Sequence, residues 1–251
     1  MKLRIRFSKL GKIRWTSHRD VARMWERAFR RVQLPLAYSE GFSPRPKVSF
    51  GLALPTGHES VAEFLDVELS AAEGIDLATL PLRLSAALPV GVDANVVSVL
   101  ETGTPSLQAD VTSCSWRWMA AAVDGAGAIG PNDLGQRVAA ALAAPALTIT
   151  RTRKGRQVSE DIRPGIAELH VCGEDAEGVW LEADLAAQPV AVRPSDVLTA
   201  LGHDLEERHV RRTHQWILRH GARLEPLSLP QGDDDVSGDV TKAPHALERA
   251  S

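Results

Sequence analysis

The sequence predicts an α+β protein made of two tandem ferredoxin-like units with antiparallel sheets. Two observations lead to this prediction. Strand patterns are interleaved with amphipathic helix patterns, and the order βαββαβ can be followed twice along the 251 residues. This length accommodates one large domain or two small ones. We expect a first unit over residues 1–104, a linker over 105–112, and a second unit over 113–225.

The first unit opens with a half-buried strand over residues 2–8, in which Leu3, Ile5 and Phe7 alternate with polar residues. Ser17 then provides a helix cap, and apolar residues follow at helical spacing as far as residue 32. The remaining patterns predict strands at 47–54 and 61–69, a helix near 75–88 and a strand at 92–99.

The second unit repeats this order after a polar, breaker-rich linker. The patterns predict a strand at 113–123, a helix at 132–143, a basic strand or hairpin arm at 147–158 and a hairpin at 167–172 and 179–185. A short helix at 194–201 ends at Gly202, and a closing strand follows at 207–218. Residues 226–251 are polar and acidic without apolar periodicity, and we expect them to form a disordered tail.

Composition excludes several classes of protein. Hydrophobic residues make up 44% of the chain and charged residues 24%, which is typical of a soluble globular protein. No apolar stretch approaches the roughly 18 residues of a membrane span, and the N-terminus lacks the apolar core of a secretory signal. The phosphate-loop and metalloprotease motifs are absent from the sequence. We therefore expect a cytoplasmic protein without membrane contact.

Charge is distributed unevenly along the chain. The formal net charge is -3, yet residues 1–50 contain thirteen Lys and Arg against three acidic residues. A second basic cluster follows at RTRKGR, with Arg151, Arg153, Lys154 and Arg156. Basic clusters of this kind are typical of proteins that bind an anionic partner, most often nucleic acid. The alternative is that these arginines only solvate the surface.

The predicted first helix carries a basic stripe opposite its apolar face. The stripe comprises Arg19, Arg23, Arg27, Arg30 and Arg31. Like charges at i,i+4 destabilise a helix by a few tenths of a kcal/mol, so these arginines require either solvent or an anionic partner. Among the partners of this type, RNA is our prediction.

The loop YSEGFSPRPKVSFG is the most distinctive segment. Gly41 permits a tight turn, two prolines stiffen the following chain, and Phe42 lies close to Arg45 and Lys47 in sequence. Phe42 would stack on a base while the cations hold phosphates, or it would fill the core beneath the loop. The sequence leaves both alternatives open.

The predicted strands suggest a further basic surface. If Leu3, Ile5 and Phe7 face the helices, then Arg4, Arg6 and Lys47 project from the other, open face of the sheet. An open sheet face is one way in which such folds bind RNA. Packing between the two units would instead satisfy these charges inside the protein.

Candidate catalytic groups are few. His18, near basic residues such as Lys9, has the residue types for metal-free RNA cleavage, while Asp66 and Asp161 are candidates for a pseudouridine-synthase-like carboxylate. Glu63 lies on an apolar strand face, and we expect it to pair with an arginine of the first helix. The two cysteines and the late histidines lack ligand spacing, so we expect no metal site and no cofactor.

Several of these segments also resemble a known family. SHRD, RAFRR, SEGFSPRPKVSFG, LPTGHES and AEFLD, followed by DIRP at residues 161–164, are similar to the uncharacterised radical-SAM-linked protein family. Its members occur beside, or fused behind, a radical SAM protein that often has a cobalamin-binding domain. The resemblance implies a partner enzyme on a separate chain, and it assigns no catalytic residue.

Three functional hypotheses follow. The first is a non-catalytic accessory protein that binds structured RNA, such as tRNA or rRNA, for modification by a separate radical SAM enzyme. The second is an RNA-acting enzyme, either an endoribonuclease or a pseudouridine-synthase-like protein. The third is a docking subunit whose arginines bind a protein partner rather than RNA. The identity of the RNA and the oligomeric state are not determined by the sequence.

Overall fold

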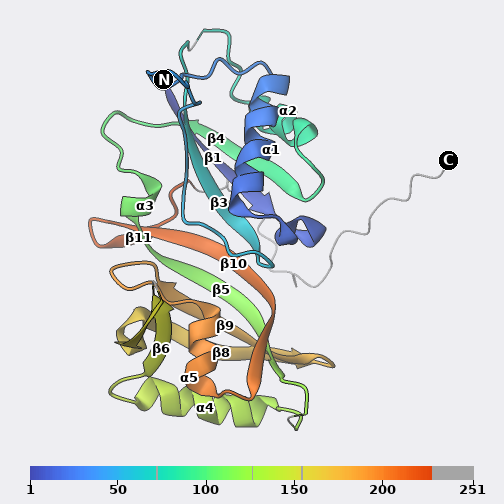
Figure 1. The fold of residues 1–251 in the computed structure, drawn as a ribbon, viewed down its shortest axis with the longest axis vertical. Helices are drawn as coiled ribbons and strands as arrows, with labels where there is room; N and C mark the ends of the chain where they lie inside the picture. The colour runs from blue at the N-terminus through green and yellow to red at the C-terminus, as the bar shows by residue number, and fades with distance from the viewer. Residues whose placement is uncertain (72, 126, 154, 228–251) are drawn as a thin grey trace, which may run out of the picture.

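The computed structural model describes residues 1–71, 73–125, 127–153 and 155–227. Over these residues the protein is a mixed α+β structure with five α-helices and a mostly antiparallel sheet. The main sheet has nine strands, and a separate two-stranded sheet lies beside it. Figure 1 shows the main sheet extending along the long axis of the molecule, from the first half to the second.

The first half of the chain supplies one end of this sheet. Its elements are β1 (Lys2–Lys9), α1 (His18–Arg31), β2 (Val48–Phe50), β3 (Glu59–Glu68), α2 (Leu80–Ala87) and β4 (Val92–Val99). The strands lie in the order β4-β1-β3, and β2 pairs with the free edge of β3 through Val48↔Val67 and Phe50↔Leu65. All of these pairings are antiparallel.

The second half supplies the other end. Its elements are α3 (Leu107–Asp110), β5 (Val111–Ala122), α4 (Pro131–Ala143), β6 (Thr148–Arg153), β7 (Arg156–Asp161), β8 (Ile166–Asp175), β9 (Gly178–Ala186), α5 (Pro194–Leu201), β10 (Leu205–Arg219) and β11 (Ala222–Leu224). The strand order is β10-β5-β9-β8, while β6 and β7 form the separate two-stranded sheet. β1 therefore lies between β3 and β4, and β5 lies in the same way between β9 and β10.

A short parallel contact joins the two halves. β3 and β10 pair only through Arg211↔Glu59 and Arg212↔Ser60. Beside this contact, the Arg212 guanidinium donates to both carboxylate oxygens of Glu63, with its Nε 3.0 Å from Oε1 and its Nη2 3.2 Å from Oε2. Arg212 is 2% exposed and Glu63 is 7% exposed. Our expectation that an α1 arginine would neutralise Glu63 was wrong, because the partner comes from β10 in the other half.

Two hydrophobic cores lie on the helix-covered face of the sheet. In the first half, Val21, Trp25 and Phe29 of α1 pack on Ile5 and Leu65. In the second half, residues of α4 and α5 pack on β5 and β9, with Trp118 and Leu181 fully buried. Figure 1 shows α1 and α2 over the upper part of the sheet and α4 and α5 at its lower part. None of the described helices is long and apolar enough to cross a lipid bilayer.

The opposite face of the first half is covered rather than open. Leu107 of α3 and Leu227, which follows β11, pack on Ala62 and Phe64 of β3. Alternation correctly places Arg4 and Arg6 on this face, but the covering segments bury both side chains. The expectation that they project from an open face was therefore wrong.

The main predicted strands and helices are present in the predicted order, but the structure also contains α3, β11 and two short 3-10 helices that were not predicted, and β2 and α2 are shorter than expected. Residues 105–112, expected as a linker, contain α3 and the start of β5, and both contribute buried residues such as Leu107 and Val111. Of the expected tail, only Pro226 and Leu227 are among the described residues.

The buried ion pair predicts a large stability difference between two neighbouring arginines. Arg212→Met removes one partner of a desolvated pair and leaves the Glu63 carboxylate buried without its cation, which costs about 3–5 kcal/mol. Arg211→Gln breaks the more exposed pair with Glu59, which is worth about 0–1 kcal/mol. Urea unfolding of both variants measures the difference, and equal losses would contradict a special role for Arg212.

Candidate functional site

A basic face along α1 is the first candidate site. Ser17 caps the helix by accepting a hydrogen bond from the backbone N–H of Asp20 at 3.2 Å, and the apolar residues of α1 point into the core. This orientation leaves all five predicted arginines of α1 exposed. We use the name α1 stripe for the four whose side chains do not bond to α2: Arg19, Arg23, Arg27 and Arg30.

Local contacts neutralise little of this charge. Arg23 lies 3.3 Å from the exposed carboxylate of Asp20, and Arg30 donates from Nε to the carbonyl of Glu26. Arg19 and Arg27 have no ion pair with any described residue. Arg31 differs, because its Nη1 donates to the Ala87 carbonyl at 2.9 Å and thus ties the end of α1 to α2. The stripe therefore presents cations that solvent or an external anion must balance.

The loop after α1 carries an exposed aromatic ring. Phe42 is fully exposed, so the alternative in which it fills the core was wrong. The loop is closed at its base, where the Ser39 N–H donates to the Arg45 carbonyl and the Arg45 N–H donates to the Ser39 hydroxyl. Gly41 adopts a φ of 117°, a conformation that side chains with a Cβ rarely adopt. A short closed loop thus holds Phe42 in solvent.

The loop cations are also at the surface. Arg45 is exposed, and Lys47 lies 3.3 Å from the carboxylate of Glu68 in a pair that is open to solvent on both sides. Such exposed pairs are worth about 0–1 kcal/mol and exchange readily for another anion. Both cations therefore remain accessible to a ligand.

Three predicted site residues have structural roles instead. Arg4 forms a bidentate ion pair with Asp66, at 2.8 Å and 3.0 Å, and both side chains are about 2% exposed. Arg6 pairs with Glu225 at 2.5 Å and lies over the ring of Phe64. These contacts occupy the charges and exclude solvent, so Arg4 and Arg6 are not phosphate ligands, and Asp66 is not an accessible catalytic carboxylate.

Two of the four predicted basic residues of the β6–β7 arm have side chains that the structure describes, and only one of these two is paired. Arg151 is paired with both Glu160 and Asp196, and it also donates to the Ala191 carbonyl. Arg156 is exposed, while Lys154 and the side chain of Arg153 lie outside what the structure describes. Asp161 accepts hydrogen bonds from the N–H groups of Leu147 and Arg163. Its carboxylate therefore fixes the end of the arm.

The structure does bring His18, Lys9 and Glu63 to one crevice, but that crevice is small. Its volume is about 10 Å³, which is about the space of one water molecule. Lys9 donates from Nζ to the carbonyls of Arg14 and Thr16, and burial lowers the pKa of its ammonium group against the opposing attraction of Glu63. His18 packs edge-on against Phe50. A nucleotide does not fit there, which disfavours the ribonuclease hypothesis at this position.

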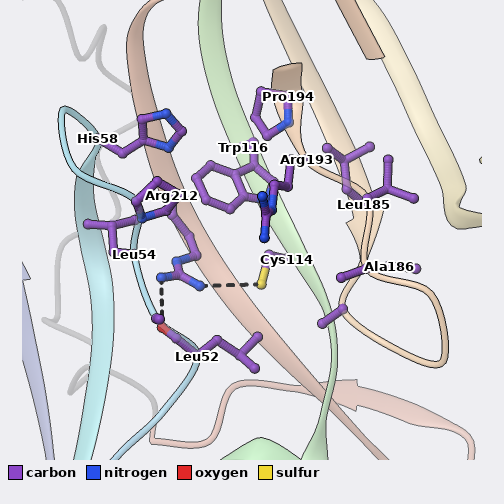
Figure 2. A pocket seen from close by; sticks show the side chains of 15 residues that line it. Leu52, Leu54, His58, Cys114, Trp116, Leu185, Ala186, Arg193, Pro194 and Arg212 are labelled. Carbon is purple, nitrogen blue, oxygen red and sulfur yellow. Dashed lines mark hydrogen bonds between the residues drawn. The ribbon is translucent and has the colours of Figure 1, made fainter. Parts of the chain in front are cut away.

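A larger cavity, of about 440 Å³, lies where the two halves meet (Figure 2). Residues 52–55 and His58 form its first-half side, and β5, β10 and the chain on either side of residue 190 form the rest. Sequence patterns did not reveal this cavity, because its walls come from segments that are far apart in the chain. No aspartate is among its described lining residues, so it lacks the carboxylate that a pseudouridine synthase requires.

The described residues contain no group of three or more His, Cys, Asp or Glu side chains arranged to hold a metal ion. The predicted lack of a metal site and of a cofactor stays a prediction.

The matched residues decide the family. The profile described as "Uncharacterized protein conserved in bacteria (DUF2344)" matches residues 2–194. The chain belongs to this family. The DUF2344 description names no radical SAM partner, so that part of the resemblance stays a prediction. No curated protein matches the chain.

Two solved structures are similar to parts of this DUF2344 chain. One is the crystal structure of a Cbf5-Nop10-Gar1 complex, with 12% identity and a TM-score of 0.48, covering 85% of this chain and 48% of that chain. The other is an H/ACA RNP bound to a substrate RNA containing 2'-deoxyuridine, with 10% identity and a TM-score of 0.45, covering 85% and 47%. The DUF2344 chain thus spans about half the length of each chain that it matches.

The two free thiols are expected to react at different rates. Burial raises the pKa of the Cys114 thiol, and the partial burial of Cys172 raises its pKa as well, so both stay mainly protonated at pH 7. Cys114 is 4% exposed, so iodoacetamide should modify Cys172 first, with both rates rising as the pH increases. Mass spectrometry of timed samples measures this order. In urea, where both thiols are exposed, the two modification rates should become similar. Faster labelling of Cys114 than of Cys172 in the native protein would contradict the predicted order.

Proposed function

We propose that the protein binds structured RNA, such as tRNA or rRNA, through the α1 stripe and the adjoining loop over residues 39–47. The observation that carries this proposal is the stripe itself, four exposed arginines along one helix with only weak neutralisation by the described residues. The helical rise places Arg19 and Arg30 about 17 Å apart along the axis. A surface of this length can contact several phosphates of a folded nucleic acid.

Charge segregation within the chain supports this choice. Arg4, Arg6, Arg151 and Arg212 are all tied to carboxylates with limited or no solvent access, whereas the arginines of the α1 stripe are exposed. An ordinary solvated helix gains stability by alternating charges, and α1 forgoes this at successive i,i+4 positions. An anionic partner would relieve that repulsion.

The loop adds a second kind of contact. Phe42 is a fully exposed aromatic ring, and Arg45 and Lys47 are accessible cations on the same segment. Stacking of an unpaired base on such a ring contributes about 1–3 kcal/mol and tolerates any base. We therefore assign Phe42 to base stacking, with Arg45 and Lys47 as phosphate contacts. Arg156 is a peripheral contact from the second half.

We further propose that the protein is a non-catalytic accessory to a radical SAM enzyme encoded as a separate chain. The resemblance of the segments between Ser17 and Asp66 supports this partner. We also propose that residues 1–104 and 113–225 are two ferredoxin-like units. The repeated strand arrangement, with β1 between β3 and β4 and β5 between β9 and β10, supports this division.

The stripe proposal is tested by charge reversal. Arg23→Glu/Arg27→Glu should weaken binding to total cellular tRNA or rRNA fragments at least tenfold. It should also make the slope of log affinity against log salt shallower by about 1.5, since each phosphate contact contributes about -0.7 to -0.9. Arg117→Glu/Arg208→Glu, an equal charge change at exposed positions of the second half, is the matched control. Unaltered binding by the stripe variant, or a salt slope near zero in the native protein, would refute RNA binding and favour a protein-docking surface.

The loop proposal is tested separately. Phe42→Ala should weaken binding to single-stranded or loop-containing RNA by about 5- to 150-fold, the equivalent of about 1–3 kcal/mol of stacking. Because the ring is fully exposed, the urea midpoint should not change. Phe42→Trp should retain binding. A loss of affinity equal for Phe42→Ala and Phe42→Trp would rule out stacking.

A further inference from the structure

The cavity between the two halves has the dimensions of a small-molecule site. Its volume of about 440 Å³ falls in the range of about 300–1,000 Å³ that is typical of ligand pockets. The walls are mainly apolar, with Leu52, Leu54, Trp116, Leu185 and Val192 among the lining side chains. Such walls favour a ligand with an apolar body.

Three polar side chains, from Arg193, Arg212 and His58, interrupt this apolar lining. Arg193 lines the cavity and forms no ion pair with any described residue, and Figure 2 shows its side chain directed into the space between Trp116 and Cys114. The Nη1 of Arg212 contacts only the Cys114 sulfur, at 3.9 Å. His58 is 7% exposed, and its Nδ1 has no hydrogen-bond partner.

The three groups differ in how they are paired. Glu63 pairs with Arg212, and Glu207 lies 3.1 Å from the Nε2 of His58. The guanidinium of Arg193, an exposed residue, pairs with no carboxylate of the described residues. A guanidinium binds carboxylate and phosphate oxygens through two parallel hydrogen bonds, which are stronger when water is excluded.

We propose that this cavity binds a small organic anion, whose carboxylate or phosphate group is held by Arg193 and whose apolar body contacts Trp116, Leu54 and Leu185. Arg212 and His58 supply the additional hydrogen bonds that orient the anionic group. The proposal is independent of RNA binding, because none of the lining residues belongs to the α1 stripe or to the loop over residues 39–47.

A fluorescent apolar anion provides the first test. Titration of the full-length protein with 8-anilinonaphthalene-1-sulfonate should give saturable binding of one dye per chain. 3-Phenylpropanoate and phenyl phosphate should displace the dye, and the more effective of the two identifies the anionic group. The neutral 3-phenylpropan-1-ol should compete at least tenfold less well. Equal competition by the neutral alcohol, or no saturable binding, would overturn the proposal.

Matched variants locate the site. Arg193→Gln keeps a polar side chain of similar reach and should raise the dissociation constant of the dye about tenfold, whereas Arg208→Gln, at an exposed arginine outside the cavity, should leave it unchanged. Ala191→Phe, at an exposed position on the cavity wall, should block binding without removing a charge. Near-UV circular dichroism verifies that each variant is folded. Equal binding by Arg193→Gln and Arg208→Gln would place the anion elsewhere, and displacement by RNA but not by small anions would also refute the proposal.

Discussion

A buried ion pair between Glu63 and Arg212 crosses the junction between the two halves of the protein. The strands that carry these residues, β3 and β10, share only two residue pairs, so the backbone contributes little to the junction. Burial lowers the pKa of the Arg212 guanidinium, but the attraction of Glu63 and the contact with Cys114 together outweigh burial and raise it, so the guanidinium stays charged. The same guanidinium contacts the Leu52 carbonyl and lies over the Trp116 ring. One side chain thereby fixes the wall of the cavity and the register of the sheet.

The arginines of this chain divide into two populations with different physical roles. Arg4, Arg6 and Arg212 are desolvated and each meets a carboxylate from a distant segment, so they specify tertiary structure. The arginines of the α1 stripe are exposed to solvent and repel one another along the helix. Because Arg4 and Arg6 of the first population and all four arginines of the α1 stripe occur within the first 31 residues, local charge density does not separate the two populations. Burial of the side chain, together with a carboxylate partner from a distant segment, distinguishes the first population from the second.

The sequence predicted the local structure well because that structure depends on nearby residues. Alternation identified β1, and the Ser17 cap identified the start of α1. Alternation also placed Arg4 and Glu63 on the correct strand faces, but it did not predict which residues surround them. Arg4 is buried because α3 and Leu227 cover the sheet, and Glu63 meets Arg212, 149 residues further along. The cavity was not predicted for the same reason, because the periodicity of a sequence does not show which distant segments meet in the fold.

The segment after β11 determines when, during synthesis, one face of the first half becomes fully buried. Glu225 and Leu227 complete the covering of Arg6 and Phe64, and Glu225 is 219 residues from its partner Arg6. During synthesis the first half emerges early, and Arg6 and Phe64 gain their contacts with Glu225 and Leu227 only when almost the whole described chain has been translated. On the nascent first half, the sheet face opposite the helices therefore exposes basic and apolar side chains that are buried in the complete fold. The last described residues complete their burial.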